Sequence, residues 1–528
     1  MDSVKHHMGQ NLETLQSWFP SGTAEGERQI QERVFVYVSD FPRILSPRAG
    51  NPYLLVGRKG TGKSAIIEVA TRILDRQKVP SVLIRPSDLD ASGLGENDSI
   101  GELKHRFQPL LLSAIASKLA ENRQGLALGD EAIIYNEAIR SGHLSSDLIG
   151  KLARSLPKIA KPLIKVDLTQ ILPEFTAVTR KELEEAIGRR VKDERFHLFI
   201  DDTDQIANPD RPGHLNRIWG LILAARELAS DIPQLRCVVS LREEVWERLK
   251  RESSAQRDQT DHFTNLVVNL SSSDKLIKEI IETRLKLASA ECGGGTEMWT
   301  TFFEGAAARP PNSETPRSWI DLVLVRSRQR PRDAIQLISQ LADHASNKQH
   351  ISKINETTFQ TVMPRFSEDR ARLFGQEFEL ECPRAEDILR TFSQVEYSEG
   401  GFRMTAESAK SHLTSAASQF GITLYGRTIK PNLEVDIFDL WRFLYVANVL
   451  NARVSDTGER DEFRHVRSED DPFLVSKPRW NEMQKMLWEV NPAFRDYLET
   501  KRNAQQAMTG LPTKEKQRRA RRARLRSK

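Results

Sequence analysis

Residues 53–70 read YLLVGRKGTGKSAIIEVA, and this stretch decides the fold of the chain. An apolar run at 53–56 precedes the pattern G-x-x-x-x-G-K-S at 57–64, and a helix-forming run follows it. Strand, glycine-rich loop and helix, in that order, are the context in which this pattern forms a phosphate-binding loop. The alternative, a glycine-containing turn with a chance lysine, is disfavoured by the flanking strand and helix. We therefore predict that the chain binds a nucleoside triphosphate here.

The chemistry of phosphate binding explains the residue types of this loop. Glycines let successive backbone N–H groups point at phosphate oxygens, which a Cβ would hinder. The N-terminus of the following helix adds partial positive charge. Lys63 can reach the β- and γ-phosphates of ATP, and the Ser64 hydroxyl can ligate Mg²⁺. The predicted ATP contacts from this segment are Gly57, Arg58, Lys59, Gly60, Thr61, Gly62, Lys63, Ser64 and Ala65.

A second signal is FHLFI followed by DDTD at 196–204. A buried strand that ends in adjacent carboxylates, downstream of a phosphate loop, is the Walker B pattern. We predict that Asp201 holds Mg²⁺ through water and that Asp202 orients or deprotonates the attacking water. The alternative is an ordinary strand that runs into an acidic turn.

A third signal is the buried strand at 234–241, which ends in Ser240-Leu241-Arg242. A cationic group at this place, on the strand next to Walker B, would point at the γ-phosphate. We therefore predict that Arg242 senses the γ-phosphate, as a catalytic residue beside Lys63 and Asp202. The alternative is a surface arginine that opens the next helix.

Arginines also open a helix that we expect over 334–345, after the segment RQRPRD at 328–333. Arginines at a helix N-terminus oppose the helix dipole, an arrangement that structure alone does not favour. We predict that Arg330 or Arg332 faces an anion such as the phosphates of the nucleotide, and we assign this contact to Arg332. The alternative is a loop with solvated arginines.

The composition indicates a soluble cytoplasmic protein. Of its 528 residues, 39% are hydrophobic and 29% are charged, and no apolar run approaches the ~18 residues of a membrane helix. The N-terminal segment MDSVKHHMGQ lacks the apolar core of a signal peptide. Three distant cysteines, Cys237, Cys292 and Cys382, disfavour disulfide and zinc frameworks. We therefore expect no membrane contact.

Strand and helix patterns alternate over 35–290, which predicts an α/β fold with a parallel sheet covered on both faces. Mostly helical patterns follow. In the last region, helices near 384–394, 405–420 and 435–450 precede a turn and a strand at 462–467, which suggests a winged helix. The expected domains are a helical lead-in (1–34), a P-loop ATPase core (35–292, with a helical insertion at about 123–180), a helical lid (293–380), a winged-helix-like domain (381–505) and a basic tail (506–528).

Two features of the last region bear on nucleic-acid binding. Four aromatic side chains at helical spacing, Phe438, Trp441, Phe443 and Tyr445, are expected in the core rather than on a surface that stacks bases. The net charge of +5 is concentrated at 514–528, which holds nine Lys/Arg and one Glu, so the rest of the chain is slightly acidic. This basic segment is either a solvated tail or a segment attracted to nucleic acid or another polyanion.

The segments GRKGTGKSA, FIDDTDQI, the strand that ends in SLR and the RPRD helix start together resemble the STAND/KAP branch of AAA-like P-loop ATPases. The resemblance implies an ASCE/AAA-like core with a helical lid and a winged-helix-like domain, and Mg·ATP as the ligand. It also implies that Arg242 is similar to the sensor arginine of NLR-type STAND proteins and that the Arg332 segment is similar to the sensor 2 region. STAND proteins commonly carry an aspartate at the place of Asp202, which fits slow turnover.

Three functional hypotheses follow. The main one is a cytoplasmic STAND-like ATPase that acts as an ATP-controlled conformational and oligomerisation switch, as in bacterial antiphage defence, with a homo-oligomer and a separate protein effector as partners. The alternative is a DNA-binding ATPase, similar to origin-recognition ATPases, that uses the winged helix and the basic tail. A third is an interaction scaffold that binds ATP, hardly hydrolyses it and senses its trigger through the insertion at 123–180.

Overall fold

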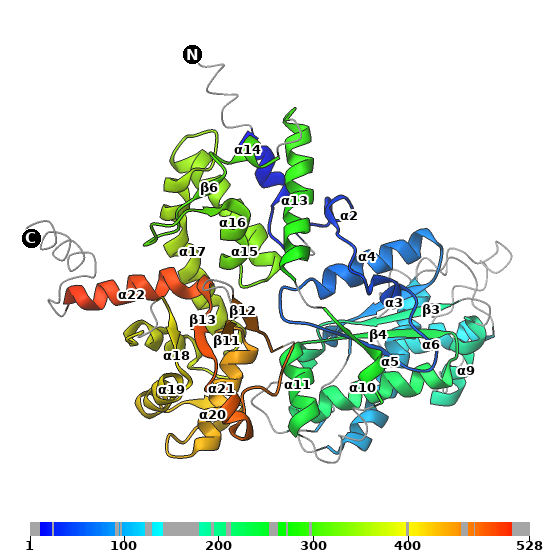
Figure 1. The fold of residues 1–528 in the computed structure, drawn as a ribbon. Coiled ribbons are helices and arrows are strands. Elements are labelled where there is room, and N and C mark those ends of the chain that lie inside the picture. Colours follow the sequence, from blue (N-terminus) through cyan, green and yellow to red (C-terminus); the bar gives the residue numbers. More distant parts are fainter. Residues whose placement is uncertain are drawn as a thin grey trace, which may run out of the picture. The chain divides into compact units, whose positions relative to one another are not determined.

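The computed structural model divides the chain into two compact units, which are described separately here (Figure 1). The central unit comprises Tyr37–Leu270, and the flanking unit comprises Met1–Val36 together with Ser271–Lys528. The residues that the structure describes are 11–23, 26–89, 94–95, 98–121, 129–140, 179–191, 195–206, 213–252, 262–270, 273–294, 298–397, 401–455, 463–468 and 470–508.

The central unit is built on a five-stranded parallel sheet with the strand order β2-β3-β4-β1-β5. Its strands are β1 (Tyr53–Val56), β2 (Ser81–Ile84), β3 (Phe196–Ile200), β4 (Leu235–Leu241) and β5 (Val267–Asn269). β4 pairs with β1 on one side and with β3 on the other. It therefore separates β1, which leads into the glycine-rich loop, from β3, which leads into Asp201 and Asp202. Because all strands run in the same direction, the residues that follow β1, β3 and β4 meet at one edge of the sheet.

Helices cover both faces of this sheet, with α4 on one face and α5 and α10 on the other (Figure 1). The four residues of β1 are all buried, as expected of a strand with both faces covered. Leu54 and Val56 of this strand belong to the same buried cluster as Phe107 of α5 and Trp219 of α10. The helices and turns are α3 (Phe41–Leu45), α4 (Lys63–Arg76), η1 (Pro86–Asp88), α5 (Ile100–Glu121), α6 (Asp130–Arg140), α9 (Arg180–Arg190), η4 (Thr203–Ile206), α10 (His214–Asp231), α11 (Glu243–Glu252) and η5 (Thr264–Leu266).

The first part of the flanking unit is a helical bundle around one apolar core. The N-terminal segment belongs to it: Trp18 donates from Nε1 to Glu291 at 2.8 Å, and buried Arg284 pairs with Glu27 at 2.6 Å. The elements are a helix over 11–18, α2 (Gln31–Val34), α13 (Asp274–Glu291), α14 (Met298–Phe302), β6 (Ala307–Ala308), β7 (Arg317–Ser318), α15 (Trp319–Arg326), α16 (Pro331–Asp343), a π-helical turn (His344–Lys348) and α17 (Glu356–Glu377).

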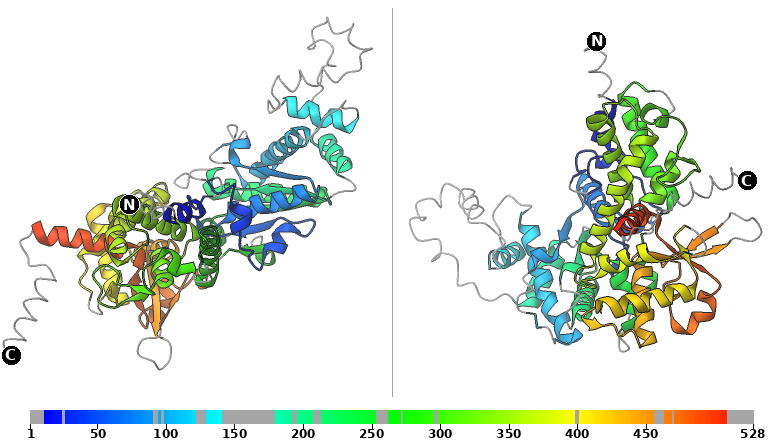
Figure 2. Two further views of the ribbon diagram at one scale, coloured as in Figure 1. Left: turned by 90° about the horizontal axis from the view of Figure 1, so that it is seen from above. Right: turned by 90° about the vertical axis from the view of Figure 1, so that its left-hand side faces the viewer.

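The second part of the flanking unit combines helices with a four-stranded antiparallel sheet of order β12-β11-β13-β8, drawn in orange and yellow in Figure 2. The aromatic side chains Phe438, Trp441, Phe443 and Tyr445 are buried in its core, as predicted. Its elements are α18 (Ala385–Thr391), η7 (Phe392–Gln394), β8 (Arg403–Met404), α19 (Ala406–Phe420), β9 (Thr423–Leu424), β10 (Arg427–Thr428), α20 (Glu434–Val446), β11 (Leu450–Ser455), β12 (Phe463–Val466), η8 (Lys477–Arg479), α21 (Trp480–Met483), β13 (Leu487–Val490), η9 (Pro492–Phe494) and α22 (Arg495–Met508).

The α/β fold class with a parallel sheet is confirmed, and two details differ from the sequence prediction. α13 groups with the flanking unit, whereas the predicted core runs from 35 to 292. The helix expected over 435–450 ends at Val446, because Asn448 adopts a left-handed φ of +57° and the chain continues into β11. Of the insertion expected at 123–180, the described residues include α6, and most of the rest lies outside them.

Candidate nucleotide-binding site

The loop at 57–64 has the close backbone packing that its glycines predict. Gly60 and Gly62 have φ values of +85° and +100°, in the left-handed region that favours glycine. A Cβ on Gly57 would lie 2.8 Å from Thr61 Oγ1 and 3.0 Å from the Leu270 carbonyl oxygen, so a larger residue would push the loop away from the strand edge. A Cβ on Gly62 would meet open space. The loop is thus a tight turn with an open side, as a phosphate cradle requires.

Lys63 lies over the backbone of this loop, at the start of α4. Its Nζ donates to the carbonyl oxygens of Gly57 at 2.7 Å and Arg58 at 3.1 Å. Burial lowers the pKa of Lys63, and the nearby carboxylates of Glu244 and Asp204 oppose that shift. The lysine therefore sits where a bound phosphate would replace the carbonyl oxygens as its partner.

Asp201 follows β3 directly and is 1% exposed. Its Oδ1 accepts a hydrogen bond from Ser240 Oγ at 2.5 Å, and its Oδ2 is buried without a hydrogen-bond partner among the described residues. A buried carboxylate oxygen without a donor is unfavourable unless a cation or a cation-bound water supplies the missing interaction. Together with the Ser64 hydroxyl, it forms a set of oxygen donors that suits Mg²⁺. The residues present therefore fit the predicted metal.

Asp202 has a left-handed backbone, with φ of +53°, and its side chain is much more exposed than that of Asp201. Its side chain is 41% exposed and lies 3.9 Å from Arg85 Nε. Partial burial raises the pKa of Asp202, and the neighbouring charges of Asp201 and Asp204 raise it further. A half-exposed carboxylate with a raised pKa can accept a proton from water more readily than an ordinary aspartate can.

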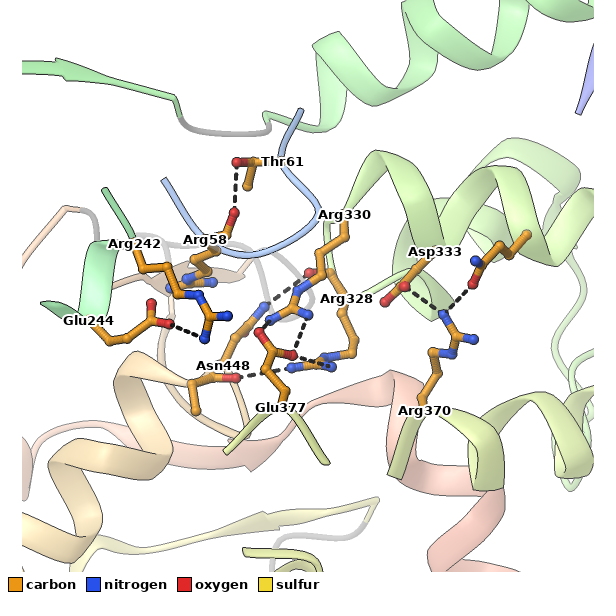
Figure 3. Close-up of polar contacts among 12 residues, drawn as sticks. Arg58, Thr61, Arg242, Glu244, Arg328, Arg330, Asp333, Arg370, Glu377 and Asn448 are labelled. Atoms are coloured by element: carbon orange, nitrogen blue, oxygen red, sulfur yellow. Dashed lines mark hydrogen bonds and ion pairs between the residues drawn. The ribbon is translucent and has the colours of Figure 1, made fainter. Parts of the chain in front are cut away.

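Arg242 follows β4, the strand between β1 and β3. Its guanidinium pairs with Asp204 at 2.7 Å and lies 3.8 Å from Glu244, a contact drawn in Figure 3. The sheet order therefore brings Arg242 to the same edge as the loop and the Walker B acids. Its cationic group is already held by two carboxylates, which fix its direction.

Two site details could not be read from the sequence. The side chain of Arg58, predicted to contact ATP, is buried and pairs with Glu243 at 3.1 Å, which leaves only its backbone for the nucleotide. Arg85, which the sequence analysis missed, lies next to Asp202. The position of Arg85 in the sequence could have identified it. It follows β2 (Ser81–Ile84) directly, and it therefore lies at the same edge of the sheet as Asp202.

Arg330 and Arg332 belong to the flanking unit, where each has a protein partner. Arg330 binds Glu377 through two contacts, at 2.8 Å and 3.2 Å (Figure 3), so the anion it faces is a carboxylate of this chain. Arg332 donates from Nε to the Gly22 carbonyl oxygen at 3.3 Å. The contact of Arg332 with a nucleotide stays a prediction.

Comparisons with known proteins found one family model for part of the flanking unit and distantly similar solved structures. Residues 274–374 match the family described as FunZ-associated C-terminal helical domain, and no curated protein matches the chain. The crystal structure of Cdc6p from Pyrobaculum aerophilum is 14% identical, over 93% of this chain and 97% of its own, with a TM-score of 0.33. The Orc1 protein from Aeropyrum pernix, solved in complex with DNA, is 14% identical over 90% and 91%, with a TM-score of 0.31.

The central unit has a P-loop NTPase fold. This conclusion depends on the observed parallel sheet, in which β4 lies between β1 and β3, and on the glycine loop between β1 and α4.

In the part of the chain that the structure describes, no helix is both long and apolar enough to cross a membrane.

Proposed function

We propose that the chain is a Mg²⁺-dependent ATPase whose reaction takes place at the carboxyl edge of the central sheet. The observation that supports this most strongly is the buried Oδ2 of Asp201, which has no donor among the described residues and lies at the strand edge beside the phosphate loop. An ordinary acidic turn would leave that oxygen in water or hydrogen-bonded.

Each residue then has a defined task. The backbone of 57–62 and Lys63 bind the phosphates, and Ser64 with Asp201 would hold Mg²⁺, which when bound neutralises charge on the phosphate oxygens. Asp202 orients the attacking water and accepts its proton. Arg242, held by Asp204, is directed toward the γ-phosphate and stabilises the charge that develops there. The assignment of Arg332 to the same phosphates belongs to this proposal.

The Lys63→Ala variant tests the nucleotide site. We expect it to lose ATP binding in isothermal titration calorimetry and to lose ATP turnover, because it removes the cation that bridges the phosphates. Lys181→Ala, which removes an exposed lysine of α9 in the same unit, is the matched control and should behave as wild type. Undiminished turnover in Lys63→Ala would show that the loop at 57–64 is not the active site.

We further propose that this ATPase acts on DNA, the second of the sequence hypotheses. The order α18, β8, α19, α20, β11, β12 resembles a winged helix, and the flanking unit gathers arginines around one cavity, described below. The STAND-like switch with a protein effector in antiphage defence has no comparable support among the described residues. Comparison of ATP turnover with and without duplex DNA distinguishes the two functions.

A further inference from the structure

A cavity of about 880 Å³ lies within the flanking unit and is lined mainly by arginines. Its lining holds seven arginines and two carboxylates, Asp274 and Glu489, an excess of five positive charges. We call it the arginine cavity. The antiparallel sheet and the segment after β12 contribute Arg403, Arg453, Arg464 and Arg467, and the bundle and the start of α22 contribute Arg317, Arg328 and Arg495.

The strand register explains why Arg403, Arg453 and His465 gather on one face of the sheet. Arg464 alternates to the other face and lines the cavity from the edge strand β12. Arg453 of β11 stands opposite His465 of β12, and Glu489 of β13 stands opposite Arg403 of β8. Because side chains alternate between the two faces of a strand, their neighbours Ala452 and Trp488 point the other way. Both are fully buried in the aromatic core. One face of the sheet thus packs on the helices, and the other presents charged groups to the cavity.

The two carboxylates of the cavity are already engaged. Glu489 contacts Arg453, His465 and Arg495. Burial alone would raise the pKa of Glu489, but the hydrogen bond from His465 and the neighbouring arginines lower it to about 2, so the carboxylate is ionised at neutral pH. Asp274 lies 3.5 Å from Arg467. Arg453, Arg467 and Arg495 thus face these two carboxylates, and Arg328 lies 4.0 Å from Glu377, while the lining as a whole keeps its excess of positive charge.

Two N–H donors of the lining also lack acceptors among the described residues. Arg328 is 2% exposed, and its Nε, like that of Arg495, is buried without a hydrogen-bond partner among the described residues. The Nη2 of Arg328 donates to the Ala447 carbonyl oxygen at 3.3 Å, so the side chain is fixed in place (Figure 3). Arg317 and Arg464 are exposed and have no ion-pair partner among the residues that the structure describes. The cavity therefore offers both fixed and accessible cationic donors.

We propose that the arginine cavity binds backbone phosphates of DNA. Guanidinium groups match phosphate oxygens in geometry, and a backbone with one charge per nucleotide can engage arginines of several strands and loops at once. The third helix of the winged-helix-like region is a poorer candidate surface. α20 carries Glu434, Asp436 and Asp439 and is buried over most of its length. This inference rests on the proposed action on DNA and names the surface that carries it.

The test measures binding of a fluorescent 20-bp duplex and of the matching single strand by anisotropy, from 50 to 200 mM salt, with the full chain and without nucleotide. The variant is Arg317→Gln/Arg464→Gln, which alters two exposed side chains and so leaves the core intact. The control is Arg365→Gln/Arg372→Gln, which removes two exposed arginines of α17 that do not line the cavity. The basic segment 514–528 is present in every variant, so its contribution cancels.

We expect the cavity variant to bind duplex roughly tenfold more weakly and its salt dependence, log K against log salt, to be about two units less steep. The control should match wild type, and Arg317→Lys/Arg464→Lys should recover most of the affinity. Equal affinities of the cavity variant, the control and wild type would overturn the proposal.

Two further outcomes separate this inference from the proposed function. Binding of inorganic triphosphate at the cavity without binding of either DNA would overturn it in favour of a small phosphorylated ligand. ATP turnover measured on the same preparation is independent of these results. Turnover without any DNA binding contradicts both the cavity and the action on DNA but not the ATPase, and DNA binding that the cavity variant leaves unchanged contradicts the cavity alone. Arginine-dependent DNA binding without turnover contradicts the ATPase alone.

Discussion

The chemistry at the strand edge depends on a few side chains whose backbone conformation was not visible in the sequence. Asp201 and Asp202 are adjacent, yet the first is buried against Ser240 and the second has a left-handed backbone and a half-exposed side chain. The sequence predicted both carboxylates and their order. It could not predict the split in their environments, because φ at Asp202 and the hydrogen bond from Ser240 depend on how β3 and β4 pair.

This split leads to a prediction for Asp202→Asn. Asparagine is tolerated in the left-handed region, so the backbone should be retained and ATP should bind with unchanged affinity. Turnover should fall by about 10²–10⁴-fold, the usual contribution of a general base. Single-turnover hydrolysis and calorimetric ATP binding, measured on the same variant, check this. Loss of both together would show that Asp202 has a structural role.

The raised pKa of Asp202 also predicts how kcat changes with pH. The carboxylate form of Asp202 is the active base. This form is lost as the pH falls through the pKa that Asp202 has in the folded protein. Because that pKa is raised, the acidic limb of kcat should lie above pH 3.8, the ordinary value for aspartate. Asp202→Asn should lack this limb. A wild-type profile that is flat down to pH 4 would contradict the assignment of Asp202 as base.

At the scale of elements, the segment between α15 and α16 is held by a buried ion pair. The side chains of Arg330 and Glu377 are 8% and 5% exposed, and Arg328 lies 4.0 Å from the same carboxylate. Removing one partner of a buried pair leaves an uncompensated charge. Arg328 and Gln329 also have positive φ values, of +51° and +55°, so the ion pair stabilises a connection whose backbone is strained.

We therefore expect Glu377→Gln to destabilise the flanking unit by about 3–5 kcal/mol. The measurement is urea unfolding followed by tryptophan fluorescence. Glu379→Gln, an exposed neighbour after the end of α17, is the control and should change the free energy of unfolding by less than about 0.5 kcal/mol. Equal stability of the two variants would show that Glu377 contributes no net stabilisation to this connection.

The elements also show how far the sequence could be read. The apolar strands β1, β3 and β4 and the helix α19 were predicted within a few residues, because an apolar run or a helical periodicity marks each of them in its own sequence. The strands β8 and β13 were missed. They are two and four residues long and are defined by pairing with each other and with β11, contacts that no local pattern encodes. The polar face of the arginine cavity depends on the same register and was missed for the same reason.

At the scale of the whole molecule, the two proposals predict that DNA affects catalysis. We expect duplex DNA to raise steady-state ATP turnover of the full chain, and we expect Lys63→Ala to show no turnover with or without DNA. Turnover and particle mass by light scattering, measured in parallel, provide the check. If DNA leaves ATP turnover unchanged and the chain forms oligomers only with ATP, the results would instead favour the STAND-like switch with a protein effector.

The division of the chain into units has a consequence for folding. The central unit is inserted into the flanking unit, so the chain crosses between them twice, after Val36 and after Leu270. Its two ends lie close together, since Arg43 donates to the Asn265 carbonyl oxygen at 3.1 Å and β1 pairs with β5. Both ends of the central unit are thus joined covalently to the flanking unit, at neighbouring points of the central sheet. It follows that replacing 37–270 by a short linker should leave the remaining halves of the flanking unit able to find each other and fold.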